Sequence, residues 1–380
     1  MTYSPIKPVP YYSTFTTSSE HALAKSLRAD VMPMLKRLLP YHHLGGLKHN
    51  FVIEFIQKHR SKYRYFLRTD IKKFYPSIVH TDLCVGAQIA YRDLLNLNYV
   101  PKNFKHKYLL ALNEWTTNLP LEHKGIPLSS PLSAVTAPLM LVPTWLYIKR
   151  RWNLPIAIYM DDVLILCESK HEISEIYEFL HNTLYAQFKL ELNQDKTESG
   201  QFSNGKLNFC GWSVSGGYAR VSEKHVEKFK TSFKELASKL NGKERGLIIK
   251  CLNNKINGFG NFYKHGNVKG QFADLDIFIR SLIRPLLLGK KRCDNSTLSS
   301  MGVQTLSAIY SKHCLKFNVN TALHPCTKLK TTGTKSKRTD SLNHEELILA
   351  SLEAMSSKLS ELIALQKKQL QCLKKLTDCL

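Results

Sequence analysis

The feature that most constrains this chain is a pair of adjacent aspartates set between two strongly apolar segments. Asp161 and Asp162 follow residues 155–160 (PIAIYM) and precede residues 163–166 (VLIL). Ile and Val favour strands and Asp tolerates turns, so the pattern predicts two short strands joined by a tight turn at the acidic pair. Carboxylates inside a hydrophobic hairpin are costly without a compensating cation. The flanks therefore favour a metal site over a solvated turn.

A second apolar segment carries a third acidic residue. Residues 65–71 (YFLRTDI) read as a strand that ends near Asp70. If the two strands lie side by side, Asp70 comes opposite Asp161. Magnesium prefers carboxylate oxygens, and a two-metal site for phosphoryl transfer needs only two or three well-placed carboxylates. We therefore expect Asp70, Asp161 and Asp162 to form such a site.

The charge balance of the chain indicates a polyanionic partner. Lys and Arg number 54 against 30 Asp and Glu, a formal net charge of +24 over 380 residues. Each neutralised phosphate releases a condensed counterion, so nucleic acid is the favoured partner over a membrane surface or a protein complex. The nine cysteines form no CxxC pair, and we find neither a signal peptide nor an uncharged apolar membrane span. We expect a reduced, cytoplasmic protein that does not insert into a membrane.

The rest of the chain reads as mostly helical, with a change of composition near the end. Helical patterns cover residues 81–96, 105–118, 130–150, 171–188, 222–240 and 245–288. Residues 289–340 are rich in Lys, Ser, Thr and Asn, and we expect a basic linker region there. Residues 341–380 carry a heptad pattern, which predicts a coiled-coil helix and a homo-oligomer. A single helix packed on its own core is the alternative.

Several motifs together resemble those of a known family. Tyr159-Met160-Asp161-Asp162 resembles the YxDD motif of reverse transcriptases, and residues 70–78 (DIKKFYPSI) are similar to the aspartate motif of the retron and group II intron branch. Further resemblances follow in the family's order: residues 125–133 (GIPLSSPLS), 192–197 (LNQDKT), the primer-grip motif 209–212 (FCGW) and the thumb segment 255–263 (KINGFGNFY). The resemblance covers roughly residues 60 to 288, and the ordered set makes chance unlikely as its source.

The resemblance implies an α+β right-hand polymerase, an RNA-directed DNA polymerase. It implies fingers over residues 1–67, a palm over 68–220 and a helical thumb over 221–288, followed by the linker region 289–340 and the coiled-coil tail 341–380. The implied substrates are dNTPs, an RNA template or non-coding RNA is the implied partner, and DNA is the product. Two Mg²⁺ ions are the implied cofactor, and Mn²⁺ is an alternative.

Roles for individual residues carry over from the same motifs. Asp70 and Asp161 would bind both metals with the Ile71 carbonyl, and Asp162 would support the site. Lys196 would act as general acid for the leaving pyrophosphate, against the alternative of a surface lysine. The implied nucleotide-binding residues are Lys72, Lys73, Phe74, Tyr75, Pro127, Ser129 and Tyr159. The implied primer grip is Phe209, Cys210, Gly211 and Trp212. Nucleic-acid contacts are expected from Arg60, Lys62, Arg64, Arg68, Asn257 and Tyr263.

Two positions depart from the family pattern and leave alternatives open. Leu128 stands where a Gln is usual, and Ser129 where a glycine is common. This departure resembles the divergent bacterial reverse transcriptases of phage defence, so we expect a dedicated RNA and an anti-phage role. Template-independent or protein-primed DNA synthesis is the first alternative, and a non-catalytic RNA-binding scaffold is another. RNA synthesis is disfavoured because Tyr75 resembles the aromatic residue that blocks a 2′-hydroxyl.

Overall fold

The computed structural model describes residues 18–44, 51–97, 102–119, 123–128, 130–215, 218–289 and 295–317. The chain divides into two compact units, Met1–Cys326 and Thr327–Leu380. The second unit, and with it the predicted coiled coil of residues 341–380, lies outside the described residues. The oligomer expected from that coiled coil stays a prediction.

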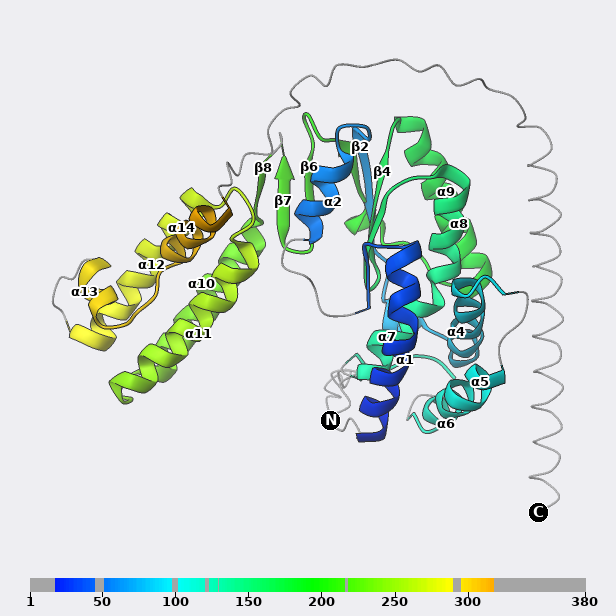
Figure 1. Ribbon diagram of the computed structural model, residues 1–380, viewed down its shortest axis with the longest axis horizontal. Helices are drawn as coiled ribbons and strands as arrows, with labels where there is room; N and C mark the ends of the chain where they lie inside the picture. The colour runs from blue at the N-terminus through cyan, green and yellow to red at the C-terminus, as the bar shows by residue number, and fades with distance from the viewer. Residues whose placement is uncertain are drawn as a thin grey trace, which may run out of the picture. The chain divides into compact units, whose positions relative to one another are not determined.

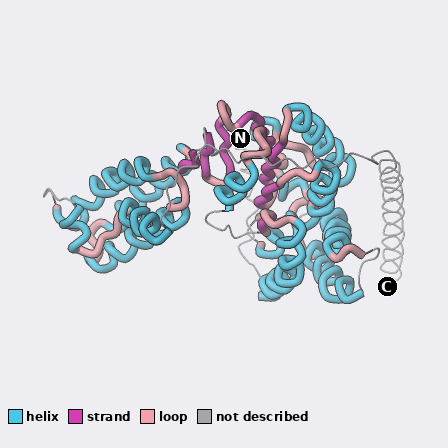
Figure 2. Tube along the Cα trace, turned by 45° about the horizontal axis from the view of Figure 1, so that its top comes forward, coloured by secondary structure: helices cyan, strands magenta, loops and turns pink. Residues whose placement is uncertain are grey.

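A five-stranded sheet forms the centre of the first unit, in the order β1-β3-β4-β2-β5. Its strands are β1 (His42–His43), β2 (Tyr65–Thr69), β3 (Ile156–Tyr159), β4 (Asp162–Cys167) and β5 (Glu198–Gln201). Strand β1 pairs with β3 in parallel, and the other neighbours are antiparallel. Figure 2 shows these strands in magenta beside the helices that cover them. The predicted α+β class is confirmed.

The predicted hairpin around the acidic pair is confirmed. Tyr159 pairs with Asp162, so Met160 and Asp161 make the turn between β3 and β4. Met160 has a φ of 59°, a left-handed conformation that non-glycine residues seldom adopt. Residues 163–167 are all buried, which explains their unbroken apolar run. Strand β2 lies next to β4 with Thr69 opposite Val163, so Asp70 and the turn lie at the same end of the two strands.

Helices pack against the sheet and on one another (Figure 1). Helix α9 (Lys170–Phe188) packs against β2 and β4, and α1 (Ser18–Leu38), α4 (His80–Leu94) and α7 (Pro131–Met140) pack on one another. Gly86 permits the α4–α7 contact, because a Cβ there would lie 2.7 Å from the Cβ of Met140. The remaining elements are α2 (Phe51–His59), α3 (Phe74–Ser77), α5 (Lys102–Phe104), the π-helix η1 (Lys105–Leu109), α6 (Leu110–Thr117), α8 (Val142–Trp152) and the 3₁₀ turn η2 (Gln194–Lys196).

Helices α7 and α8 together form a segment long and apolar enough to span a membrane by length and composition. The segment Pro131–Trp152 has a mean hydropathy of 1.4 over its most apolar window, and 78% of that window is buried inside the protein. A buried core helix meets the same criterion. The apolar character of this segment is therefore explained by packing.

A second, three-stranded sheet and a group of helices complete the unit. Strands β6 (Lys206–Phe209), β7 (Trp212–Ser215) and β8 (Tyr218–Val221) form an antiparallel meander. Helices α10 (Glu223–Leu240), α11 (Arg245–Tyr263) and α12 (Lys269–Leu288) follow, close to the predicted helical ranges. The meander and helices meet where the ring of Trp212 packs edge-on against Tyr263, with centroids 5.0 Å apart.

The linker predicted over residues 289–340 requires a correction in its described part. Residues Asn295–Ser300 form α13, and Leu306–Phe317 form α14, which packs on α11 and α12 (Figure 1). The buried carboxylate of Asp276 accepts hydrogen bonds from the backbone N–H groups of Leu306 and Ser307, at 2.8 and 2.9 Å, and so caps α14. Val303, Leu306 and Tyr310 are buried. Their helical spacing was a signal that the polar composition of the region obscured.

Candidate active site

Two of the three predicted carboxyl groups meet at the end of the central strands. Asp70 follows β2, Asp161 lies in the β3–β4 turn, and their side chains are within hydrogen-bonding reach of each other. Burial, followed by the nearby Asp70 carboxyl, raises the pKa of Asp161 well above its usual range. The two adjacent carboxyl groups, buried at Asp70 and half-buried at Asp161, repel one another when both are ionised. A cation between them would relieve that repulsion.

The third carboxyl group is turned toward a different partner. Asp162 is the first residue of β4, and both of its oxygens accept hydrogen bonds from the Arg68 guanidinium, at 2.9 and 3.0 Å. Arg68 also donates to Glu198 Oε1 at 3.3 Å. Burial raises the pKa of Asp162, and Arg68 opposes that rise. Asp162 therefore lies beside the predicted metal site with its carboxylate engaged elsewhere.

Lys196 lies directly against the carboxylate pair. Its Nζ is 2.5 Å from Asp70 Oδ2, and its side chain remains 58% exposed. The hydrogen bond to Asp70 raises the pKa of Lys196, so the ammonium form that a proton donor needs is favoured. The 3₁₀ turn η2 and the short bridge between Ile71 and Leu192 bring this motif to the end of β2. The predicted site residue is thus beside the carboxylates, and its role as general acid stays a prediction.

The backbone around Ile71 is held by hydrogen bonds of its two neighbours. Asp70 O accepts from Asn193 N, and Lys72 N donates to Glu191 O, both at 2.8 Å. Hydrogen bonds in an antiparallel pair go through alternate residues, so the peptide groups of Ile71 point to the opposite side. The Ile71 carbonyl is therefore directed away from this bridge.

The motif at residues 125–133 is held against the Asp70 motif by backbone hydrogen bonds. Gly125 N donates to Ile78 O at 2.7 Å, and Ile126 N donates to Tyr75 O at 3.1 Å. Tyr75 is buried, and its pKa is raised by that burial and then by the nearby Asp161 and Tyr159. Tyr75 therefore lies near the turn that carries Asp161, and its contact with a nucleotide sugar stays a prediction. Tyr159 itself is half-buried at the end of β3.

The position that departs from the family pattern is open to solvent. Leu128 is 47% exposed, whereas Pro127 before it is buried. Ser129 lies outside the described residues. Ser130 is the N-cap of α7, accepting from Leu132 N at 3.2 Å and donating to Glu20 Oε2 at 3.1 Å. The motif is thus anchored on both sides of an exposed apolar side chain.

Three other residues predicted to contact nucleotide lie on the short helix α3 or just before it. Phe74 is buried against Tyr75, with ring centroids 5.4 Å apart, so it supports the site from within the core. Lys72 is exposed and pairs with Glu191 at 3.4 Å. Lys73 is exposed, with a left-handed φ of 48°. Both lysines remain accessible to a phosphate.

The predicted primer grip is the tight turn between β6 and β7. Phe209 and Trp212 pair across the hairpin and are buried, while Cys210 and Gly211 form the turn with φ values of 48° and 84°. Two successive positive φ angles fit a two-residue hairpin turn. A Cβ on Gly211 would lie 2.5 Å from the hydroxyl of Tyr263, so the turn is packed tightly on α11.

The predicted nucleic-acid contacts are separated by the fold. Arg64 is exposed, Arg60 is half-buried, and Lys62 pairs with Glu168 at 3.0 Å on the surface. Arg68 does not belong to that surface cluster, because its side chain faces Asp162 and Glu198.

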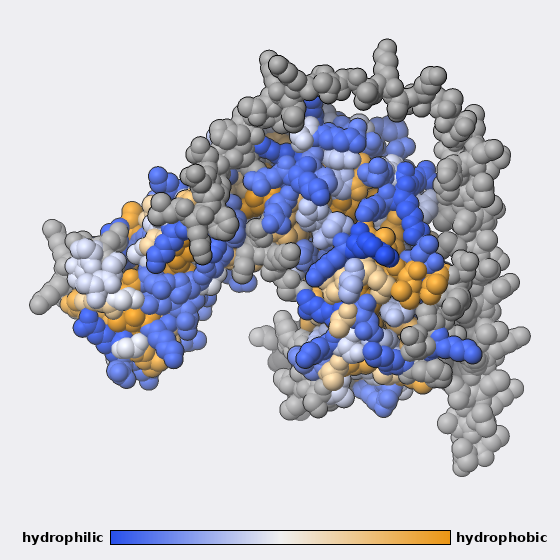
Figure 3. Space-filling view, in the orientation of Figure 1, coloured by the Kyte–Doolittle hydropathy of each residue, from blue (hydrophilic) through white to orange (hydrophobic). Residues whose placement is uncertain are grey.

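On α11, Asn257 is half-buried, while Tyr263 is buried under the primer-grip turn and acts in packing. Arg68 and Tyr263 thus make internal contacts in this structure, and their role as nucleic-acid contacts stays a prediction. Figure 3 shows hydrophilic residues along α10, whose exposed lysines are Lys224, Lys228, Lys234 and Lys239.

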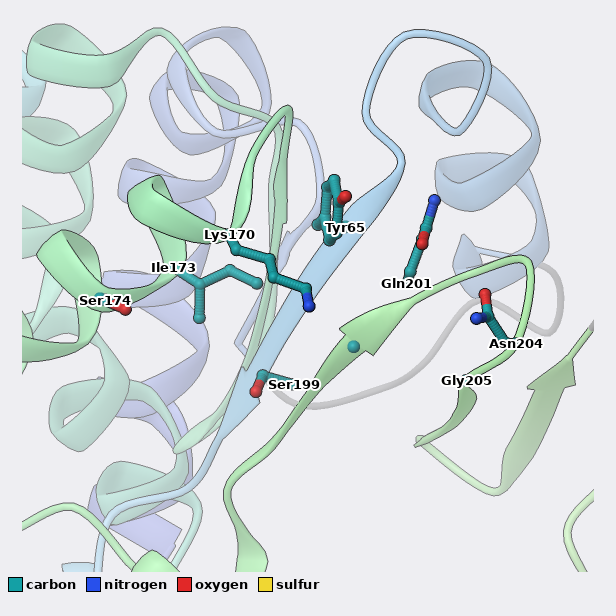
Figure 4. Close-up of a pocket in the computed structure, with 9 residues that line it drawn as sticks. Tyr65, Lys170, Ile173, Ser174, Ser199, Gln201, Asn204 and Gly205 are labelled. Atoms are coloured by element: carbon teal, nitrogen blue, oxygen red, sulfur yellow. The ribbon is translucent and has the colours of Figure 1, made fainter.

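Two features of this region were missed by the sequence analysis. The first is Glu198, which joins Arg68 to the hairpin of the primer grip. The second is a cavity of about 540 Å³ at the edge of the sheet, between β5 and the start of α9 (Figure 4). Tyr65, Lys170 and Ser199 line it, and none of its lining residues was a predicted site residue. The register of β5 with β2 places Glu198 opposite Arg68, and residues of α9 complete the lining of the cavity.

The carboxylate pair fits a divalent cation. Asp70 and Asp161 supply the hard oxygen ligands that Mg²⁺ prefers, and substrate phosphates complete such sites in phosphoryl-transfer proteins. Within the described ranges, no group of three or more His, Cys, Asp or Glu side chains gathers as a metal site.

Comparison with protein families gives two matches that together span most of the described chain. Residues 17–230 match the model described as reverse transcriptase (RNA-dependent DNA polymerase). Residues 226–295 match the group II intron, maturase-specific domain. The second match covers helices α10 to α12.

The solved structures that match this chain include two Candida telomerases. Telomerase from Candida albicans in complex with a telomeric RNA fragment is 10% identical with a TM-score of 0.41, and the match covers 77% of this chain and 51% of that one. Apo telomerase from Candida tropicalis is 11% identical with a TM-score of 0.42, covering 79% and 56%. This chain spans about half the length of these telomerase chains. No curated protein matches the chain.

Proposed function

Because this chain belongs to the reverse transcriptase (RNA-dependent DNA polymerase) family, we propose that it synthesises DNA from dNTPs on an RNA template. The observation that carries this proposal is the meeting of Asp70 and Asp161 at the end of β2 and the β3–β4 turn. The match to the group II intron maturase-specific domain over residues 226–295 supports an enzyme of the group II intron type.

The residues around the carboxylates have distinct roles in this proposal. Asp70 and Asp161 would hold the divalent ions, and such ions would supply activation of the primer 3′-hydroxyl and stabilisation of the leaving pyrophosphate. Tyr75 lies beneath the sugar of the incoming nucleotide and excludes a 2′-hydroxyl. The Lys196 ammonium, poised at Asp70, donates a proton to the pyrophosphate oxygen as it leaves.

The RNA partner is the finer part of the proposal. The net charge of +24 and the exposed lysines along α10 support extended contact with a nucleic-acid backbone, because such contacts depend on charge and not on sequence. We favour a dedicated structured RNA that supplies template or primer. The anti-phage role rests only on the departure at Leu128 and Ser129, and it stays a prediction from sequence.

The test is nucleotide incorporation by the full chain on defined substrates. Primed RNA and primed DNA templates would each be offered with Mg²⁺ and either dNTPs or NTPs, beside Asp161→Asn and a sample treated with RNase. The proposal predicts dNTP incorporation on the RNA template that is lost in both controls.

Other outcomes would redirect the account. Incorporation that survives RNase without any template favours template-independent or protein-primed synthesis, the alternative that the departure at Leu128 leaves open. RNA binding without incorporation of any nucleotide would overturn the enzymatic proposal and favour a binding scaffold.

A further inference from the structure

A continuous chain of polar contacts joins the catalytic turn to the primer-grip hairpin. Asp162 binds the Arg68 guanidinium through two hydrogen bonds of 2.9 and 3.0 Å, and Arg68 Nη1 lies 3.3 Å from Glu198 Oε1. The second oxygen of Glu198 accepts from the backbone N–H of Asn208 at 3.1 Å. Asn208 lies on β6, two residues before the turn formed by Cys210 and Gly211.

The strand register explains why these residues meet. Strand β2 lies between β4 and β5, with Arg68 opposite Leu164 on one side and directly opposite Glu198 on the other. Asp162 is two residues from Leu164 and therefore lies diagonally across from Arg68 on the same face. A long side chain reaches both the direct and the diagonal neighbour in a sheet.

The contacts are of a kind that fixes geometry. The Arg68 and Asp162 side chains are only 16% and 19% exposed, and Glu198 is 33% exposed. A guanidinium that meets a carboxylate through two parallel bonds holds its orientation as well as its distance, which a lysine cannot do. Asp162 directly follows the turn residue Asp161, so fixing Asp162 also orients the turn that carries the metal ligand.

We propose that Arg68 and Glu198 are positioning residues that hold the catalytic turn in register with the primer-grip hairpin. The relay is the chain of contacts from Asp162 through Arg68 and Glu198 to the backbone N–H of Asn208. Asp162 belongs to this relay and does not ligate metal. The proposal rests on the proposed function, since it assumes that Asp161 and the hairpin act on one primer end. It assigns a structural partner to the second aspartate of the YxDD motif and gives Glu198 a role for the first time.

The first measurement separates relay from metal ligation. Mn²⁺ binding to the full chain would be followed by electron paramagnetic resonance for the wild type, Asp161→Asn and Asp162→Asn. We expect Asp161→Asn to weaken binding by roughly tenfold or more, as for loss of a carboxylate near a metal. Asp162→Asn should weaken binding less than Asp161→Asn does, because it alters a residue that orients the ligand and not the ligand itself. Equal loss in both variants would make Asp162 a metal ligand and overturn the proposal.

The second measurement reads the relay without relying on activity. Hydrogen exchange over residues 206–212 would be measured by mass spectrometry in Asp162→Asn and Arg68→Lys, neither of which alters a residue of the hairpin. We expect faster exchange in both variants. Glu223→Gln is the matched control, because Glu223 also contacts β6, through an exposed pair with Lys206 at 3.3 Å, and should leave exchange unchanged. Unchanged exchange in both relay variants would overturn the proposal.

Kinetics then link the relay to synthesis. Arg68→Lys and Glu198→Gln should lower kcat roughly 10–100-fold, as for residues that orient a metal ligand through others, with little change in the KM for dNTP. The single variants Arg68→Gln and Asp162→Asn and their double variant form a separate cycle, in which the double variant removes both half-buried charges together and serves as the folding control. The loss in the double variant should be smaller than the product of the losses in Arg68→Gln and Asp162→Asn, because the residues act as one unit. A fully multiplicative loss would contradict the relay.

Failure of the proposed function gives a different pattern. A wild-type chain that binds Mn²⁺ but incorporates no nucleotide on any template would contradict the polymerase proposal. The metal-binding and hydrogen-exchange results would still decide whether Asp162 belongs to the relay.

Discussion

At the residue scale, the burial of Tyr75 beside Asp161 gives the sharpest prediction about substrate choice. Replacing Tyr75 by Ala removes the ring predicted to lie under the sugar, so discrimination for dNTP over NTP should fall by roughly tenfold or more. Tyr75→Phe keeps the ring and should keep the discrimination. Single-nucleotide incorporation with each substrate measures the ratio of kcat/KM values. An unchanged ratio in Tyr75→Ala would show that the Tyr75 ring does not exclude the 2′-hydroxyl. The folded fraction of this variant must be checked, because a buried ring is lost.

For individual residues, the sequence predicts part of the site but not all of its contacts. The meeting of Asp70 and Asp161 was predictable, because each lies at the end of an apolar run typical of a buried strand. The partner of Asp162 was not, since Arg68 and Glu198 are brought to it only by the register of three strands that are distant in sequence. The packing of Tyr263 was not predictable either, because its motif gives no sign of whether the ring faces solvent or, as here, the turn at Gly211.

At the element scale, the cap of α14 is held by a single buried side chain. Asp276→Ala removes the acceptor of two backbone N–H groups and should lower the free energy of unfolding by about 2 kcal/mol, in the range of strong helix caps. Asp274 lies at an exposed position of α12, the helix that also carries Asp276, so Asp274→Ala is the matched control and should have little effect on stability. Denaturant unfolding measures both. Equal stabilities of the two variants would show that the cap contributes nothing.

A pair of glycines tests helix packing in opposite directions. Gly86→Ala places a Cβ 2.7 Å from the Met140 Cβ, so α4 and α7 must separate, at a cost of about 1–3 kcal/mol. Gly258→Ala meets no atom within 4 Å on the helix α11 and should stabilise by up to about 1 kcal/mol, since Ala favours helix. Thermal unfolding compares the two. A stabilising Gly86→Ala would contradict the close approach of α4 and α7.

Elements were predicted better than their ends or their packing. The helix over 171–188 and the hairpin at Asp161 follow from clear periodicity and apolar runs. The helix α14 was missed because Lys, Ser and Thr dominate its region, and the Asp276 cap comes from a distant helix. Local composition cannot report a cap supplied by another part of the chain.

At the scale of the whole molecule, one prediction concerns the tail, residues 341–380, which lies outside the described residues. Deleting residues 341–380 should lower the molecular mass in solution to that of a smaller assembly, because the heptad pattern predicts self-association there. Mn²⁺ binding at Asp70 and Asp161 should remain, since both lie in the separate unit Met1–Cys326. Light scattering coupled to size-exclusion chromatography gives the mass. A truncated chain that keeps the full-length oligomer number would place the assembly elsewhere.

The central claim is that the Asp70–Asp161 pair performs metal-dependent DNA synthesis on RNA. The most direct measurement is the rate of single-dNTP addition to a primed RNA template over a Mg²⁺ titration, with the wild type, Asp161→Asn and the exposed control Asp274→Asn. The account predicts that Asp161→Asn loses about 10³-fold in rate, because several kcal/mol of transition-state stabilisation disappear, while Asp274→Asn equals the wild type. Addition that proceeds without Mg²⁺, or that survives in Asp161→Asn, would contradict it.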